Sequence, residues 1–450
     1  MRKAPPEAAD SGASLRRSIP SVERILTSPR FASLIDTFSR ARVRDAIAAH
    51  LADLRRAQRP WDEEEAFDAA AISLRTATGS TLRRVINATG VIIHTNLGRS
   101  PIDRALWSDA ADVVSGYSNL EFDLDHGERG ARDEHLAELC RSLFGCEAAV
   151  LTNNNAAGTL LMLAATAAGS DVLVSRGELV EIGGSFRVPD VIQQGGARLR
   201  EVGTTNRTRA RDYASAVDAQ TAAILRVHRS NFSIVGFTET TSVAELMAVA
   251  REKRVPLLYD EGTGRVVDIS RYGFEKKETI RELIAAGVDA VACSTDKLIG
   301  ATQGGLILGR EEIIAKCRRH PLMRALRAGK ESYAVIAETL RAFVTDRYEE
   351  RVPIYRMLAT SIEALRERAQ WLGAANIIDS RCALGGGTTP AETIASMAIA
   401  IEGNANEQYA RFLKNDPPIV GRINDDRFTL DMRTLLEEDL PHISRVIATL

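Results

Sequence analysis

The short apolar run Ala290-Val-Ala-Cys293 is followed by Ser294-Thr-Asp-Lys297-Leu-Ile-Gly300. An apolar run of this length predicts a buried strand, so Lys297 should lie about one turn beyond the strand's end. Burial there would lower the pKa of the Lys297 amine and make it a usable nucleophile towards a carbonyl group. Ser294 could donate its hydroxyl to a phosphate bound nearby. Taken alone, a lysine in this position is more often an ordinary surface residue.

Similar apolar runs flank this stretch, and longer helical patterns separate them. The other predicted strands are 148–151, 171–174, 198–202, 222–227, 256–259 and 306–308, and helices are predicted at 156–168, 243–253 and 280–286. This alternation predicts an α/β domain whose mostly parallel sheet is covered on both faces. Ligands bind beyond the carboxyl ends of such strands. We therefore expect the site at segments 152–155, 178–185, 228–231, 260–264 and 294–297.

Two of these segments carry residues that complement Lys297. Asp260 ends a predicted strand, and an aspartate there could pair with the ring nitrogen of pyridoxal phosphate held by the lysine. Asn153, Asn154 and Asn155 begin an alanine-rich helix whose free amides would bind a phosphate. Asp260 could instead simply cap a helix. The three elements in this order predict a pyridoxal-phosphate enzyme of the aspartate-aminotransferase fold type I.

The flanking sequence predicts two further parts. Residues 1–80 read as an N-terminal helical module with a linker, with its helical pattern running from Pro20 to Thr78. Extended chain is expected at 83–96, before a turn at Gly98–Arg99. The large core domain is assigned to 81–345 and a small α+β domain to 346–450. A helical stretch at 311–371 should break near Pro321 and Pro353.

Composition and charge exclude several classes of protein. The chain has 450 residues, of which 45% are hydrophobic and 26% charged, as in a folded globular protein. Its five cysteines show no metal-binding or disulfide pattern, which predicts a protein without a bound metal. The sequence also shows no secretory signal and no long apolar run, so we expect a cytoplasmic protein. The net charge is −2, but the first 60 residues hold twelve Lys/Arg against six Asp/Glu. That local excess is either a solvated helical surface or a phosphate-binding one.

Five further motifs are Asn87–Arg99, Asn153–Ala157, Val174–Arg187, Glu201–Arg207 and Val227–Asn231. Together they resemble the bacterial selenocysteine synthase family, also called L-seryl-tRNA(Sec) selenium transferase. The similarity extends from about Ser18 to Asp425, which is nearly the whole chain. It implies an enzyme that converts serine esterified to tRNA(Sec) into selenocysteine, using selenium from selenophosphate.

The resemblance also implies partners and residue roles. Lys297 would carry the pyridoxal phosphate, and the N-terminal helical domain would bind seryl-tRNA(Sec). The family assembles as a ring-shaped homodecamer built from dimers. Arg324 and Arg327 share one helix face by their spacing, and with Arg99 they would bind the selenophosphate anion. His228 and Ser230 belong to a matching motif and are candidate cofactor contacts, although His228 could equally satisfy a neighbouring carbonyl.

Other readings of the sequence remain open. Thr295 stands where the family pattern has glycine, Glu261 replaces an apolar residue beside Asp260, and the loop 300–304 also differs. A related pyridoxal-phosphate lyase acting on a small amino acid or sugar-amino acid is therefore the alternative, and a catalytically silent tRNA-binding protein is a third reading. The N-terminal module favours the transferase, because a lyase with a small substrate has no use for it. Cys293 is interpreted as a core residue.

Overall fold

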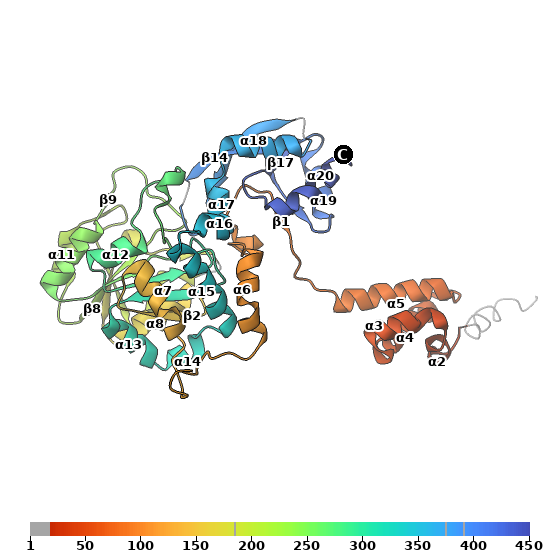
Figure 1. The fold of residues 1–450 in the computed structure, drawn as a ribbon, viewed down its shortest axis with the longest axis horizontal. Helices are drawn as coiled ribbons and strands as arrows, with labels where there is room; N and C mark the ends of the chain where they lie inside the picture. The colour runs from red at the N-terminus through yellow and green to blue at the C-terminus, as the bar shows by residue number, and fades with distance from the viewer. Residues whose placement is uncertain (1–18, 184–185, 374–375, 390–391) are drawn as a thin grey trace, which may run out of the picture. The chain divides into compact units, whose positions relative to one another are not determined.

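The structure is a computed structural model that describes residues 19–183, 186–373, 376–389 and 392–450. The chain divides into two compact units, Met1–Arg84 and Val85–Leu450. The first unit is drawn in red and orange in Figure 1 and contains only helices among its described residues. The second unit contains the sheets and the predicted site.

Four α-helices form the described part of the N-terminal unit. They are α2 (Val22–Leu26), α3 (Ala32–Phe38), α4 (Arg40–Ala57) and α5 (Glu63–Thr78). Asp62 caps α5 by accepting a hydrogen bond from the Glu65 amide at 2.8 Å, as its sequence position favours. The apolar residues that recur every three or four positions pack into one small core, which includes Phe31, Ile47 and Leu51. The predicted helical module is confirmed.

The second unit is built around a seven-stranded sheet. Its strand order is β2-β12-β11-β10-β8-β3-β6, and every neighbouring pair is parallel except those made by β12. The strands are β2 (Ala148–Thr152), β3 (Asp171–Ser175), β6 (Arg198–Val202), β8 (Thr221–Val227), β10 (Leu257–Asp260), β11 (Ala290–Ser294) and β12 (Gly305–Gly309). All seven strands predicted from the sequence are present, and the mostly parallel α/β fold is confirmed.

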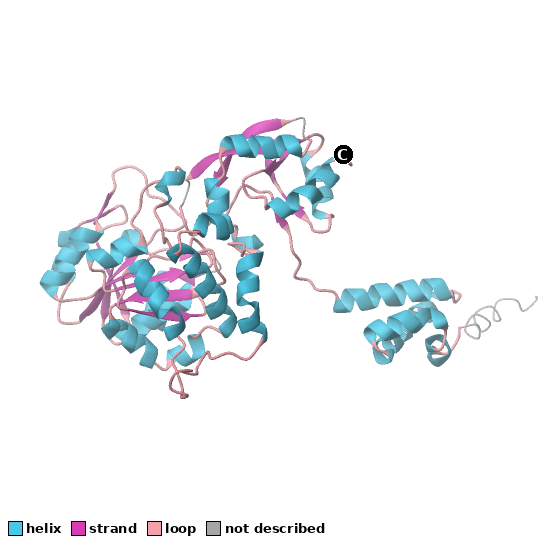
Figure 2. Ribbon diagram, in the orientation of Figure 1, coloured by secondary structure: helices cyan, strands magenta, loops and turns pink. Residues whose placement is uncertain are grey.

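Helices cover both faces of this sheet, as Figure 2 shows with cyan helices around the magenta strands. Alternate strand residues enter separate apolar cores: Leu257 and Tyr259 of β10 face one, and Leu258 faces the other. The first core includes α7 (Glu134–Phe144), α11 (Val243–Lys253), α12 (Ile280–Ala286) and α15 (Lys330–Val344). The second includes α8 (Asn155–Ala167), α9 (Val188–Gln194) and α13 (Glu311–Arg319). Burial on both faces explains why the strands are continuously apolar.

A four-stranded antiparallel sheet forms the C-terminal part of the same unit. Its order is β13 (Ile377–Ala383), β14 (Thr393–Ile401), β17 (Arg427–Asp431) and β16 (Arg422–Asn424). Helices α18 (Ile362–Trp371), α19 (Ala405–Leu413) and α20 (Leu440–Ile447) share its apolar core. The short strand β1 (Ile86–Asn87) pairs with β15 (Ile419–Val420), so the chain after Arg84 begins against this C-terminal sheet. The boundary expected near residue 345 stays a prediction.

Two local predictions need correction. Only Ile86–Asn87 of the expected extended segment 83–96 forms a strand, because the Asn87 side chain bonds the Thr89 amide and the Val91 carbonyl and turns the chain. The helical stretch 311–371 breaks at more places than Pro321 and Pro353. It also breaks at Gly329, at Asp346 with φ +54°, and at Thr360, producing α13, α14 (Leu322–Leu326), α15, α16 (Tyr348–Arg351), α17 (Pro353–Ala359) and α18.

Candidate functional site

The predicted site residues follow neighbouring strands at the carboxyl edge of the seven-stranded sheet. Asp260, the last residue of β10, pairs in register with Val227 of β8 and Ala292 of β11. Lys297 follows the end of β11, and His228 follows the end of β8. The parallel register therefore brings Asp260, His228 and Lys297 to one place, although their sequence separations are large.

Lys297 is the central residue of this edge. It is only 7% exposed, and its Nζ donates a hydrogen bond to the Gly387 carbonyl at 2.9 Å. Burial lowers the pKa of the Lys297 amine. Its backbone is fixed as well, because the Ser100 hydroxyl donates to the Lys297 carbonyl at 2.6 Å. A buried amine with a lowered pKa and no carboxylate bonded to it is suited to covalent chemistry.

Asp260 is buried to a similar degree, with 6% exposed. Its Oδ1 accepts a hydrogen bond from Asn155 Nδ2 at 2.8 Å. Burial raises the pKa of the Asp260 carboxyl, whereas the bond from Asn155 and the charge of Lys297 act to lower it. Asn155 thus connects the start of α8 to the end of β10 and helps to hold the charge on the aspartate.

The three consecutive asparagines have different surroundings. Asn154 caps α8, with its side chain accepting from the Ala157 amide at 2.9 Å. The Asn153 amide donates to the Leu326 carbonyl at 2.7 Å, while the Asn153 side chain is exposed. Gly305 of β12 lies directly against this loop, since a Cβ there would be 2.1 Å from the Asn154 carbonyl oxygen. The loop is therefore tightly fixed at the start of an apolar helix.

His228, Ser230 and Ser294 all lie at this edge. The His228 amide donates to the Asp260 carbonyl at 3.0 Å, and its Nε2 is 2.9 Å from the Thr388 carbonyl oxygen. A carbonyl can only accept, so Nε2 carries the hydrogen. Burial lowers the pKa of the His228 imidazole and favours this neutral form. Ser294 ends β11 and is buried, and the buried hydroxyl of Ser230 has no hydrogen-bond partner among the described residues.

The three predicted anion-binding arginines have no common partner. Arg99, which has a positive φ of 64°, pairs through Nη1 with Asp296 Oδ2 at 2.5 Å, next to Lys297. Arg327 pairs with Glu121 at 3.1 Å, while its backbone bridges to Thr152 beside the asparagine loop. Arg324 on α14 is exposed and makes no ion pair with the described residues. Their joint action as an anion cradle stays a prediction.

Sequence reasoning missed the contribution of the C-terminal sheet to this site. The loop after β13 places the Gly387 carbonyl on Lys297 and the Thr388 carbonyl on His228. Gly387 has φ +80°, and a Cβ there would lie 2.6 Å from Lys297 Nζ. The signal available in the sequence was the run Gly385-Gly386-Gly387, which indicated only a turn.

The two unusual residues near the lysine and aspartate stabilise their own loops. The hydroxyl of Thr295 donates to the Thr302 carbonyl at 2.6 Å and closes the loop after Lys297. Glu261 accepts hydrogen bonds from the amides of Thr263 at 3.0 Å and Gly264 at 2.6 Å. Both side chains are buried and internally bonded. In the predicted segment 178–185, Glu178 is buried and pairs with Arg226 at 2.6 Å, whereas Gly184 and Ser185 lie outside the described residues.

Two searches of the described residues bear on the class of protein. No cluster of three or more His, Cys, Asp or Glu side chains suited to a metal ion occurs in the described ranges. Within the same ranges, no helix combines the length and the hydropathy needed to cross a membrane. All five cysteines are buried and unpaired, as expected for Cys293.

Comparison with known proteins gives a consistent picture. Residues 85–436 match the family model "L-seryl-tRNA selenium transferase", and residues 16–55 match "Selenocysteine synthase N terminal". The chain is 44% identical to the L-seryl-tRNA(Sec) selenium transferase of Geobacter sulfurreducens, over 94% of this chain and 97% of the relative. It is 41% identical to the Hyphomonas neptunium protein of the same name, over 95% of this chain and 97% of the relative.

Among solved structures, D-glucosaminate-6-phosphate ammonia-lyase has a similar fold. Its TM-score is 0.61 at 23% identity, covering 83% of this chain and 98% of that one. A likeness at this identity concerns the fold alone. The whole-length matches carry the assignment of family and confirm the resemblance seen in the sequence motifs. The chain belongs to the L-seryl-tRNA selenium transferase family.

Proposed function

We propose that this protein is a pyridoxal-phosphate-dependent enzyme that converts L-seryl-tRNA(Sec) to L-selenocysteinyl-tRNA(Sec) with selenophosphate. The observation that carries the proposal is the pair of buried residues Lys297 and Asp260 at the carboxyl edge of the sheet, with the partly buried Asn155 bonded to Asp260. They occur in a chain that matches the family over nearly its whole length. The N-terminal unit, which matches a family model of its own, favours a tRNA substrate over a small free amino acid.

The described residues fit pyridoxal phosphate. Lys297 offers a buried amine with a lowered pKa, and Asp260 offers a buried carboxylate for the ring nitrogen. Two buried polar atoms near them, Asn155 Oδ1 and Ser230 Oγ, have no partner among the described residues. Buried polar atoms without partners in a native fold call for a ligand or water. The amides at the start of α8 would hold the phosphate.

The protein's own residues then perform the following tasks. When bound, pyridoxal phosphate supplies an electron sink for the bonds at the α-carbon of the seryl group. Asp260 would hold a proton at the ring nitrogen, and Asn155 keeps this carboxylate oriented. Lys297 would hold the cofactor through Nζ, and as a free amine it could move a proton at the α-carbon. The Gly387 and Thr388 carbonyls hold Lys297 and His228 in position.

The direct test is conversion of charged tRNA. Seryl-tRNA(Sec) incubated with the holoenzyme and selenophosphate should yield selenocysteinyl-tRNA(Sec), measured by radiolabelled selenium retained on the tRNA. Lys297→Ala should yield none. An enzyme that instead releases ammonia from free small amino acids, and leaves seryl-tRNA unchanged, would support the lyase reading.

We assign tRNA binding to the N-terminal unit. Five of its arginines are held in ion pairs: Arg30, Arg40, Arg44, Arg56 and Arg59. Arg24, Arg42 and Arg55 are exposed and make no ion pair with the described residues, so they are the better candidates for phosphate contacts. We expect replacement of these three by glutamine to flatten the salt dependence of seryl-tRNA binding. The slope of the logarithm of the binding constant against the logarithm of the salt concentration should fall by about 0.9 per lost contact. Replacing the paired Arg40, Arg44 and Arg56 is the matched control, and equal effects would show a non-specific surface.

An oligomer in the cytoplasm, a decamer built from dimers, is part of the proposal. The exposed large apolar residues Trp107, Tyr117, Phe122 and Leu124 support it, because such residues gathered in one chain segment indicate a covered surface. Sedimentation of the purified protein should give the mass of ten chains. A monomer would contradict this part alone.

A further inference from the structure

Arg265 carries an almost completely buried charge that has no ion-pair partner in the part of the chain that the structure describes. Arg265 directly follows the turn Glu261–Gly264 in the sequence, and it is 1% exposed. Both terminal guanidinium nitrogens lack a hydrogen-bond partner, and Arg265 makes no ion pair with the described residues. A guanidinium can only donate hydrogen bonds and stays charged in proteins. A buried, uncompensated positive charge is strongly unfavourable, so the fold keeps it at a high cost.

Arg265 lines a cavity of about 460 Å³ that opens beside the ends of β8 and β10, next to His228. Most other charges of the cavity wall are already compensated. Lys277 pairs with Glu392 at 2.8 Å and with Glu275 at 3.7 Å, and Arg226 pairs with Glu178 at 2.6 Å. The remaining wall carboxylates are those of Glu261 and Glu278. Oε2 of Glu261 accepts two backbone amides and its Oε1 accepts the Thr263 hydroxyl, while Glu278 is exposed.

Arg229 is the second basic residue of this wall without a carboxylate partner. It lines the same cavity, and its Nη2 donates only to the Thr240 hydroxyl at 3.2 Å. Two guanidinium groups are thus left without an ion pair among the described residues. Two wall carboxylates are also outside ion pairs, but Glu278 is exposed to water and the buried Glu261 is satisfied by hydrogen bonds within its own turn. Within the described residues of this wall, the terminal nitrogens of Arg265 are thus buried donors that lack an acceptor.

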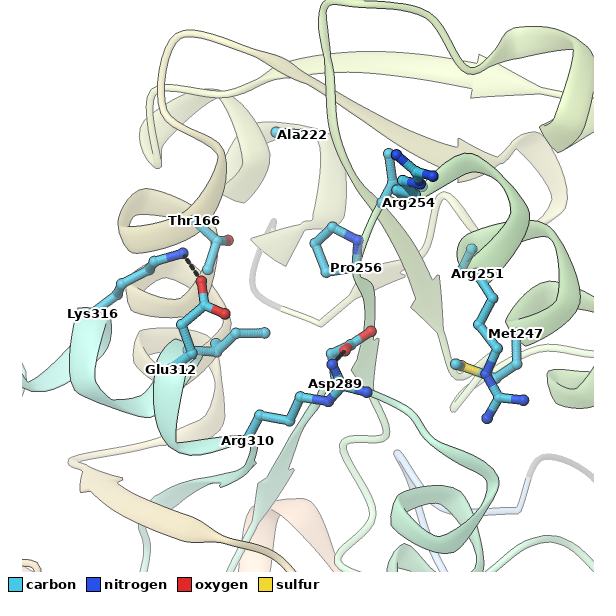
Figure 3. A pocket seen from close by; sticks show the side chains of 13 residues that line it. Thr166, Ala222, Met247, Arg251, Arg254, Pro256, Asp289, Arg310, Glu312 and Lys316 are labelled. Carbon is cyan, nitrogen blue, oxygen red and sulfur yellow. Dashed lines mark hydrogen bonds and ion pairs between the residues drawn. The ribbon is translucent and has the colours of Figure 1, made fainter.

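A second pocket of similar size shows that a basic lining alone does not leave buried charges without partners. At the amino edge of the sheet, a pocket of about 420 Å³ is lined by Arg251, Arg254, Arg310 and Lys316. There Lys316 bonds Glu312 and Arg310 reaches Asp289, as Figure 3 shows. The basic side chains of that pocket are largely exposed. Water can hydrate them, so nothing there calls for a ligand.

We propose that the cavity beside His228 binds an oxyanion of the phosphate class, with Arg265 as its main ligand and Arg229 as a second. The planar fork of a guanidinium matches two phosphate oxygens, and shielding from bulk water strengthens such charged hydrogen bonds. The anion has two possible sources, free inorganic phosphate or the phosphate of a terminal nucleotide of tRNA. The class of anion does not rest on the proposed function, whereas the choice of source does.

The test is phosphate binding to the full-length holoenzyme, measured by isothermal titration calorimetry at constant ionic strength. Arg265→Met should weaken phosphate binding at this site about tenfold or more. Without phosphate, the same variant should unfold at no lower temperature than the wild type, because it removes an unpaired buried charge. Arg310→Met at the amino edge is the matched control and should leave phosphate binding unchanged. Unaltered phosphate binding by Arg265→Met would overturn the proposal.

Three further measurements keep the result unambiguous. Arg265→Lys retains a charge without the fork, and should fold and bind phosphate more weakly; wild-type affinity in this variant would also overturn the proposal. Arg324→Met should keep the binding that depends on Arg265, since it alters a different predicted anion site. Adenosine 5′-monophosphate that competes with phosphate and needs Arg265 would identify the nucleotide as the source, and phosphate binding without such competition would identify the free anion. These titrations measure phosphate binding and not turnover, so they test the anion site even if the protein does not transfer selenium.

Discussion

The two edges of the seven-stranded sheet both carry charged side chains, but those of the amino-edge pocket are largely exposed, whereas several at the carboxyl edge are buried. At the amino edge, Arg310 pairs with Asp289 at 3.1 Å and Lys316 with Glu312 at 2.7 Å, and both basic side chains are about half exposed. At the carboxyl edge, Lys297 is 7% exposed, and among the described residues its amine bonds to a carbonyl and to no carboxylate. Charges that compensate each other in water need no further explanation. Buried charges held without a full partner indicate function.

The difference arises from the way the chain leaves the strands. At the carboxyl edge, β10 and β11 end in buried loops. The loop 384–389 of the C-terminal sheet contacts Lys297 and His228 there through the carbonyls of Gly387 and Thr388. At the amino edge, helices α11 and α13 end or begin near the strand ends, and their charged side chains extend into solvent. Water therefore reaches one set of charges and is excluded from the other.

The largest expected effect is that of Lys297→Ala. Loss of the amine should abolish the absorption at about 420 nm of the purified protein after dialysis. It should also lower turnover by about a thousandfold or more. Absorbance and the selenium-labelling assay measure the two effects. A variant that keeps a borohydride-reducible chromophore would place the reacting lysine elsewhere and would break the contrast between the edges.

Asp260→Asn should have the next largest effect. Asparagine has the same size and can still accept from Asn155, so cofactor content should stay near that of the wild type. The neutral amide cannot stabilise a protonated ring nitrogen, and turnover should fall about a hundredfold. Absorbance gives the cofactor content and single-turnover kinetics give the rate. Near-normal rates would show that Asp260 only caps its loop.

The sequence predicted which strand ends meet at this edge of the sheet, but it did not predict that the C-terminal sheet contacts them. Lys297, Asp260 and Asn155 could be found because each directly follows an apolar strand, and the parallel register then brings strand ends together. Gly387 and Thr388 could not be found, because they come from a different sheet 90 residues beyond Lys297. Arg265 carried no signal either, since an arginine after a glycine turn is ordinary until its burial is known. The ion pair between Arg99 and Asp296 could not be predicted either, because the two residues are far apart in the sequence and meet only in the folded chain.

The predicted selenophosphate arginines should separate into two behaviours. Arg324 is exposed and makes no ion pair with any described residue, so Arg324→Ala should slow the selenium-addition step by about tenfold or more and leave stability unchanged. Arg327 pairs with Glu121, which also binds Arg132 at 2.6 Å and Arg129 at 2.9 Å. Arg327→Ala should therefore also lower the unfolding temperature. Single-turnover selenium transfer and thermal unfolding distinguish the two, and loss of the earlier hydroxyl elimination would assign these arginines to the tRNA or the fold.

Stability of the cofactor-free protein should depend on the Lys297 amine. Burial lowers the pKa of this amine in the folded chain, while its pKa in the unfolded chain is about 10.4. Between those two values the unfolded chain binds more protons, so the free energy of unfolding should rise with pH in that window. Lys297→Met should remove this rise, as followed by urea unfolding at a series of pH values. A rise that persists in the variant would assign it to another group.

The smallest effect is expected at the amino edge, and it separates an exposed ion pair from the buried hydrogen bond beside it. In the Arg310–Asp289 pair the arginine side chain is 58% exposed, so Arg310→Met should change the free energy of unfolding by only about 0–1 kcal/mol. Asp289 has a second role, because its Oδ2 accepts the Leu257 amide at 2.8 Å at the start of β10. Asp289→Ala would leave that buried amide without its partner and should cost about 1–3 kcal/mol. Urea unfolding measures both, and turnover should be unchanged in Arg310→Met because the residue lies at the edge opposite Lys297. A loss of activity in Arg310→Met would show that the amino edge takes part in function, and the contrast between the two edges would fail.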